Sequence, residues 1–190
     1  VLEDGVELLA QCSVQGQTRL GARTRVFPFA SIGAAAQDLK PHGDNPTLTV
    51  GSDCLFREGV TVNTGTEGGG GKTVVGNKCV LLANSHVAHD CIIGDGVIMS
   101  NNVMLAGHCT VGDSVIFGGG SAVHQFSRIG HHAFIGGLAG IAGDVIPFGM
   151  ATGHRADRIG LNLIRMKRAA VQRAAMKAGR PINREGYTYD

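Results

Sequence analysis

An apolar residue recurs at every sixth position through the middle of this 190-residue chain. A helix would repeat every ~3.6 residues and a half-buried strand every 2. A fixed six-residue period is instead typical of a parallel β-helix, in which each unit is a short strand followed by a corner. The residue after the apolar one is often Gly, which we expect to supply the unusual dihedral angles of the corner. The series reads Val75, Leu81, Val87, Ile93, Met99, Leu105, Val111, Phe117, Val123, Ile129, Ile135 and Ile141.

Three such units make one triangular coil, so residues 18 apart are expected to lie above one another on parallel strands about 4.8 Å apart. We therefore predict an all-β solenoid over residues 1–150, interrupted by loops at 34–48 and 64–73. The second loop, TGTEGGGGKT, resembles a phosphate-binding loop but has Thr66 where that pattern requires its first Gly, and no helical pattern follows it. The period also holds at Leu2, Leu8, Val14, Leu20, Val26, Ile32, Val50, Phe56 and Val62.

A different pattern follows the repeats, and we predict a second segment over residues 151–190. The six-residue period is expected to end at Ile146 and Pro147. Asp157 could cap a basic helix from Arg158 to about Lys177, and the remaining residues are expected to form a tail.

Composition narrows the function. A net charge of +2 gives no argument for nucleic-acid binding, and no apolar run reaches the ~18 residues of a membrane span. No secretory signal is expected, and all five cysteines fall at the inward small-residue position. This favours reduced packing residues over disulfides or metal ligands, and a cytoplasmic protein. These cysteines are Cys12, Cys54, Cys79, Cys91 and Cys109.

Residues suited to proton transfer gather in one part of the repeat. NSHVAHDC contains His86, His89 and Asp90, and the 18-residue step predicts that Gly107 lies above His89 and His108 above Asp90. Imidazole titrates near neutral pH, and a neighbouring carboxylate can orient it as a general base. A Gly N–H one coil above could stabilise an oxyanion.

Four motifs carry a specific resemblance. NSHVAHDC, NNVMLAGH, GGGSAVHQF and the earlier QDLK resemble the family of UDP-N-acetylglucosamine O-acyltransferases that begin lipid A biosynthesis. The resemblance runs from about Phe27 to Arg168. It implies a left-handed parallel β-helix with a C-terminal helical segment, assembled as a homotrimer with active sites between subunits. It also implies transfer of a 3-hydroxyacyl chain from the phosphopantetheine of acyl carrier protein to the sugar 3-hydroxyl, with no metal or other cofactor.

The resemblance assigns roles to individual residues. His89 matches the general base, Asp90 the residue that orients it and Gly107 the oxyanion donor. Gly137 matches the position that measures acyl length, and a Gly there favours a longer chain. The matching substrate-binding residues are Asp38, Lys40, His86, His108, Gly119, His124, Gln125, Gly137, Asn162 and Arg168.

Other functions stay open on the sequence alone. Asn63 stands where many family members have His, so an amide-forming transfer to a diamino UDP-sugar is one alternative. A second is a zinc hydratase of the γ-carbonic anhydrase kind, with His86, His89 and His108 as ligands. The sister N-acyltransferase of the same pathway and a non-catalytic solenoid are the others.

Overall fold

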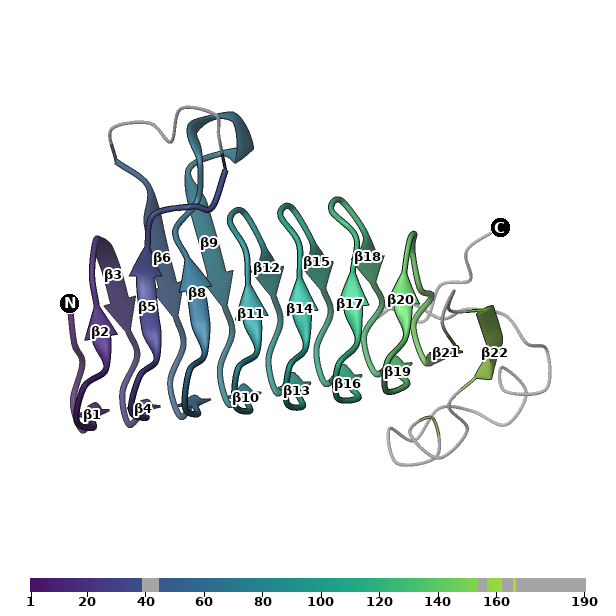
Figure 1. Ribbon diagram of the computed structural model, residues 1–190, viewed down its shortest axis with the longest axis horizontal. Coiled ribbons are helices and arrows are strands. Elements are labelled where there is room, and N and C mark those ends of the chain that lie inside the picture. The colour runs from purple at the N-terminus through teal and green to yellow at the C-terminus, as the bar shows by residue number, and fades with distance from the viewer. Residues whose placement is uncertain (39–44, 154–156, 162–165, 167–190) are drawn as a thin grey trace.

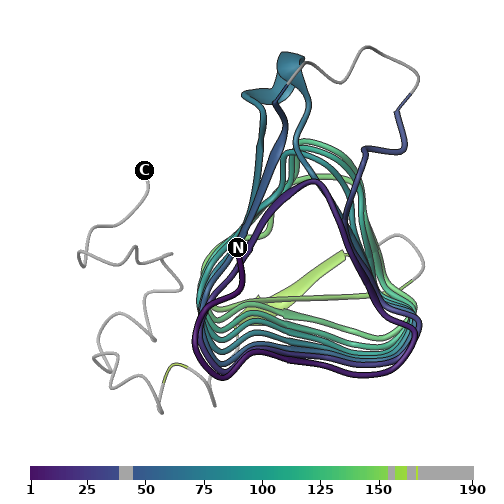
Figure 2. The same cartoon turned by 90° about the vertical axis from the view of Figure 1, so that its left-hand side faces the viewer.

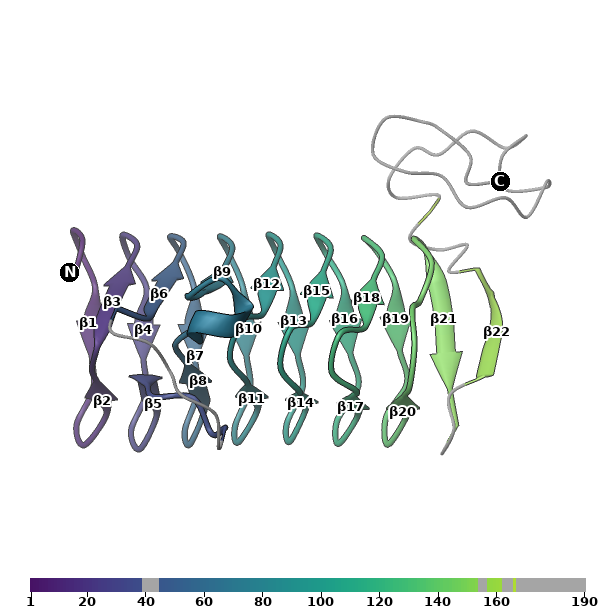
Figure 3. The same ribbon diagram turned by 90° about the horizontal axis from the view of Figure 1, so that it is seen from above.

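The chain winds into a triangular prism with one sheet, parallel along almost its whole length, on each side (Figures 1, 2 and 3). The computed structural model describes residues 1–38, 45–153, 157–161 and 166. Most strands are two residues long, and the single described 3-10 turn is η1 (Glu67–Gly69).

The strands fall into three sheets, and within each sheet the order is that of the chain. The nine-stranded sheet contains β1 (Glu7–Leu8), β4 (Arg25–Val26), β7 (Leu55–Phe56), β10 (Val80–Leu81), β13 (Ile98–Met99), β16 (Ile116–Phe117), β19 (Phe134–Ile135), β21 (Gly149–Thr152) and β22 (Asp157–Leu161). The seven-stranded sheet contains β2 (Ser13–Val14), β5 (Ser31–Ala34), β8 (Thr61–Asn63), β11 (His86–Val87), β14 (Met104–Leu105), β17 (Ala122–Val123) and β20 (Gly140–Ile141). The six-stranded sheet contains β3 (Gln17–Leu20), β6 (Thr47–Val50), β9 (Lys72–Val75), β12 (Ile92–Ile93), β15 (Thr110–Val111) and β18 (Arg128–Ile129).

The 18-residue register predicted from the repeat is confirmed. Ile93 of β12 pairs with Val111 of β15, and Leu105 of β14 pairs with Val123 of β17. The recurring apolar residues point inward and form one continuous buried core. Cys54, Cys79, Cys91 and Cys109 are buried and unbridged, and Cys12 packs against the core, which confirms their inward placement.

The expected reason for the corner glycines is wrong. Gly76, Gly94 and Gly112 do not have positive φ. They are small because the next coil passes close above them: a Cβ on Gly94 would collide with the Asp113 carboxylate. The left-handed corner positions are held mostly by other residues, among them Asp90 at φ 58°.

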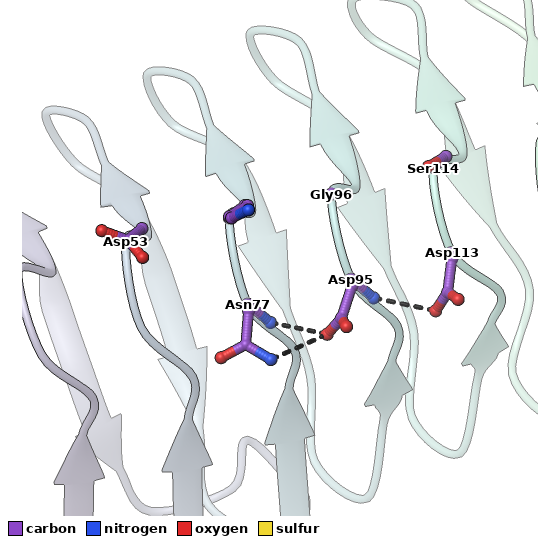
Figure 4. Close-up of a pocket in the computed structure, with 7 residues that line it drawn as sticks. Asp53, Asn77, Asp95, Gly96, Asp113 and Ser114 are labelled. Atoms are coloured by element: carbon purple, nitrogen blue, oxygen red, sulfur yellow. Dashed lines mark hydrogen bonds between the residues drawn. The ribbon is translucent and has the colours of Figure 1, made fainter.

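A ladder of polar side chains runs up the corner between the six-stranded and nine-stranded sheets (Figure 4). The Asn77 main-chain N–H donates to Asp95 Oδ1 over 2.8 Å, and the Asp95 N–H donates to Asp113 Oδ1 over 2.9 Å. Each side chain thus satisfies a corner N–H of the preceding coil, which has no strand partner.

The C-terminal end of the solenoid differs from the prediction. The coil continues past Pro147 into β21, because Ile135 pairs with Ala151, a step of 16 residues instead of 18. The predicted helix begins at Arg158, but residues 157–161 form β22, antiparallel to β21. The pairing satisfies main-chain groups along the last parallel strand, an interaction that local helix propensity does not reveal. Apart from Met166, the rest of that helix lies outside the described residues.

No helix in the described ranges has the length and apolar character needed to cross a membrane.

The ladder leads to a stability prediction. Asp95→Ala removes the acceptor of two Asn77 donors and is expected to lower the unfolding free energy by about 1–2 kcal/mol, measured by urea denaturation. Asp95→Asn keeps a carbonyl oxygen there, as Asn77 does one coil earlier, and is expected to lose less than half as much. Equal losses in the two variants would contradict the ladder's role.

Candidate active site

Both long loops leave the prism at one corner, between the seven-stranded and six-stranded sheets (Figures 1 and 2). One loop joins β5 to β6 and the other joins β8 to β9. His89 and Asp90 lie at the same corner one coil later, between β11 and β12. We call this the loop corner, comprising the described residues 35–38, 45–46, 64–71, 88–91, 106–109 and 124–127.

The carboxylate of Asp90 is buried, with its side chain only 1% exposed, and it is fully hydrogen-bonded. Thr66 donates its main-chain N–H to Oδ1 over 2.9 Å and its hydroxyl to Oδ2 over 2.6 Å. His89 Nδ1 lies 2.8 Å from Oδ2. Asp90 itself donates its N–H to the hydroxyl of Thr73 over 2.9 Å. The carboxylate is therefore held in one orientation.

This carboxylate determines how His89 can act. An ionised carboxylate only accepts hydrogen bonds, so Nδ1 of His89 must carry the proton and Nε2 presents the lone pair of the neutral ring. The His89 side chain is 13% exposed, and Nε2 lies 3.9 Å from Oδ2 of Asp38, in the first loop. His89 therefore has the geometry of a general base that opens toward the loop corner.

Gly107 brings main chain against the imidazole. A Cβ at this position would lie 2.5 Å from Cε1 of His89, so only Gly allows the contact. The Gly107 N–H donates to no acceptor in the described part of the chain. The carbonyl of the same peptide group, Ala106 C=O, accepts the Cys91 thiol over 3.2 Å. A fixed, unused N–H beside a base is the arrangement of an oxyanion donor.

Two more histidines border this pair. The His108 ring meets His89 edge-on, with centroids 5.0 Å apart, and stacks on Phe126 at 4.4 Å. His86 lies on the outer face of β11 with Nδ1 2.7 Å from the hydroxyl of Thr61. Burial, with a smaller contribution from the charge of His89, lowers the pKa of His86.

The structure brings together five of the predicted site residues at the loop corner: Asp38, His89, Asp90, Gly107 and His108. His86 neighbours them, and His124 and Gln125 lie at the same corner in the next coil. Gly119 and Gly137 lie together at the corner between the nine-stranded and seven-stranded sheets, where a Cβ on Gly137 would be 3.3 Å from Gly119 O. Lys40, Asn162 and Arg168 lie outside the described residues.

Sequence reasoning missed Thr66 and Gly69. The glycine-rich segment does project as a loop, but it folds back so that Gly69 covers the Asp90 carboxylate, where a Cβ would collide with it. The place of the insertion in the repeat is the signal that could have found these two residues. The insertion leaves the same corner as Asp90, one coil earlier.

The residues at this corner do not fit a zinc ion well. His89, Asp90 and His108 offer ligand atoms within 4.8 Å of one another, but His86 is not in that group. The shared oxygen of Asp90 already accepts Thr66 and His89 over 2.6 and 2.8 Å. Zinc would have to break these bonds to reach its ligands at about 2.0–2.2 Å.

Comparison with known proteins identifies the family. A family described as bacterial transferase hexapeptide (six repeats) matches residues 72–107, and one described as UDP N-acetylglucosamine O-acyltransferase, domain 2, matches residues 144–185. The solved structure of LpxA from Acinetobacter baumannii is 39% identical, with a TM-score of 0.89 over 92% of this chain and 67% of that one. The chain belongs to the UDP-N-acetylglucosamine O-acyltransferase family. Its fold is accordingly the left-handed parallel β-helix that the resemblance implies.

Two further relatives extend this comparison. The curated acyl-[acyl-carrier-protein]–UDP-N-acetylglucosamine O-acyltransferase of Rhizobium etli is 55% identical over 176 residues. The match covers 93% of this chain and 65% of that relative, so the chain spans about two thirds of its length. The solved UDP-N-acetylglucosamine acyltransferase of Arabidopsis is 32% identical, with a TM-score of 0.82 over 93% of this chain and 69% of that one.

The surroundings of His86 lead to a pH prediction. Since burial favours the neutral ring, the pKa of His86, followed by NMR of the Hε1 proton, is expected below the ordinary 6.5. The unfolded chain then binds more protons than the fold, so the contribution of His86 to stability is present above pH 6.5 and is lost as the pH falls below it. A midpoint at or above 6.5 would contradict this account.

Proposed function

We propose that the chain transfers a 3-hydroxyacyl group from acyl carrier protein to the 3-hydroxyl of UDP-N-acetylglucosamine, the first step of lipid A biosynthesis. One observation carries the proposal: the Asp90-bound imidazole of His89 packs directly against Gly107, whose N–H is unused in the described chain.

The proposed chemistry is direct transfer. His89 Nε2 takes the proton of the sugar hydroxyl as its oxygen attacks the thioester carbonyl, forming a C–O bond and an oxyanion that the Gly107 N–H stabilises. The intermediate collapses by breaking the C–S bond. The phosphopantetheine thiolate leaves and takes the proton from His89. Asp90 stays ionised and supports the imidazolium throughout.

The acceptor would enter beneath the first loop. The Asp38 carboxylate, 3.9 Å from His89 Nε2, is placed to accept a sugar hydroxyl beside the base. By resemblance, Lys40, Asn162 and Arg168 would bind the nucleotide or the carrier arm, and His86, His108, His124 and Gln125 would line the pockets.

The acyl chain has an apolar route to Gly137. From Gly107 the outer face of the seven-stranded sheet leads to the corner that carries Gly119 and Gly137. Met104, which is 50% exposed, and Ala122 face outward on paired strands of this sheet. Apolar side chains here suit a hydrocarbon chain, and the two glycines would let it continue.

The wider setting is also part of the proposal. We infer a homotrimer with active sites between subunits, no cofactor beyond the donor's phosphopantetheine, and a cytoplasmic location. We also propose that residues 1–150 form the acyltransferase unit and residues 151–190 a C-terminal segment, which β21 and β22 join to the nine-stranded sheet.

The alternatives differ in the acceptor or the chemistry. Asn63 does not select a diamino sugar directly, since its Nδ2 donates to Ala34 O and Ala35 O and so anchors the first loop. The zinc hydratase has in its favour only the group of His89, Asp90 and His108.

Mass spectrometry of the product tests these functions together. Purified protein is given UDP-N-acetylglucosamine, a diamino UDP-sugar and a mixture of acylated carriers, and is analysed for zinc. The proposal predicts an alkali-labile ester at the sugar 3-position. An alkali-stable amide as the main product, or one zinc per chain with hydratase activity and no transfer, would replace it.

Loss of the base gives the sharpest kinetic prediction. His89→Ala is expected to lower kcat by roughly 10²–10⁴, the usual scale for a general base, in a coupled acyl-carrier assay. His131→Ala, at the corner between the six-stranded and nine-stranded sheets, is the control and should keep near-normal kcat. Near-normal turnover of His89→Ala would remove His89 from this role.

A further inference from the structure

We propose that Thr66 is a positioning residue for the reaction: it fixes the Asp90 carboxylate so that His89 keeps its base nitrogen free and correctly aimed. This inference rests on the proposed function for the role of His89, and it assigns the glycine-rich loop a purpose of its own.

Thr66 holds both oxygens of one carboxylate. Its N–H reaches Oδ1 and its hydroxyl reaches Oδ2, over 2.9 and 2.6 Å, and Thr66 itself is only 5% exposed. Gripping both oxygens prevents the carboxylate from rotating about its Cβ–Cγ bond. Oδ2 therefore stays where the Nδ1 of His89 meets it at 2.8 Å.

The loop is folded to hold Thr66 in turn. The Thr66 carbonyl accepts the N–H of Gly71 over 2.7 Å and that of Gly69 over 3.0 Å, closing the turn η1. Gly70 and Gly71 adopt φ of 93° and 74°, a region that other residues rarely occupy. Gly69 lies too close to Asp90 for any side chain. The glycines therefore allow a tight turn that covers the Asp90 carboxylate. They do not form a phosphate-binding loop.

Thr66 and His89 donate hydrogen bonds to the same oxygen of the Asp90 carboxylate. Within the described ranges, the charged or titratable groups facing His89 are Asp38, Asp90, His86 and His108. The negative charge on Oδ2 of Asp90 is stabilised by two donors, the Thr66 hydroxyl and the His89 Nδ1–H. Without the hydroxyl, Oδ2 loses one of its two donors and the carboxylate can turn, which leaves the Nε2 of His89 poorly aimed.

Three variants test the proposal. Thr66→Val removes the hydroxyl at nearly constant shape, and Thr66→Ser restores it. Thr64→Val is the matched control, because Thr64 is also buried in this loop but contacts Ala34 O instead of Asp90.

The measurement is kcat and KM for acyl transfer. For Thr66→Val we expect about a tenfold loss of kcat with KM near its wild-type value, because the base is misaligned while the substrate contacts stay in place. Thr66→Ser should regain the wild-type values, and Thr64→Val should keep them. Wild-type kcat in Thr66→Val, or a loss that Thr64→Val shares, would overturn the positioning role.

Failure of the proposed function looks different. In that case the wild-type protein itself transfers no acyl group. The positioning role is then tested by measuring, with NMR, how fast the His89 Nδ1 proton exchanges with solvent in the same three variants. Faster exchange in Thr66→Val alone supports the positioning role, and equal exchange in all variants overturns it.

Discussion

The parallel hydrogen bonds between coils fix which distant residues stand above one another. His108 N–H donates to His89 O over 3.0 Å, and Phe126 N–H donates to Gly107 O over 3.1 Å, so the loop corner is locked coil by coil. Slipping a strand by one residue would turn buried residues such as Ile93 and Val111 outward. The apolar interior thus enforces the register on which the His89–Gly107 contact depends.

The buried carboxylate of Asp90 would be costly in this setting without its donors. The second loop supplies them without disturbing the prism. Val62 pairs with Val87, a step of 25 residues where a regular coil takes 18, and both remain buried. An insertion at a corner can therefore add chemistry to a solenoid while the interior repeat runs on unchanged.

The repeat made much of this predictable. The six-residue period placed Ile93 and its equivalents in the interior, and the 18-residue step placed Gly107 against His89. The repeat could not place Thr66, because Thr66 lies in an insertion where the 18-residue step does not hold. The two-residue shortening before Val145 and the pairing of β22 with β21 are likewise tertiary effects that no local pattern encodes.

The central claim is that Asp90 holds the proton of His89 on Nδ1 and so leaves Nε2 as the base. The most direct test is the ¹⁵N chemical shifts of the neutral His89 ring in the wild-type protein, which distinguish the two tautomers. The account predicts the Nδ1–H tautomer. A ring that is mainly protonated on Nε2 would contradict it.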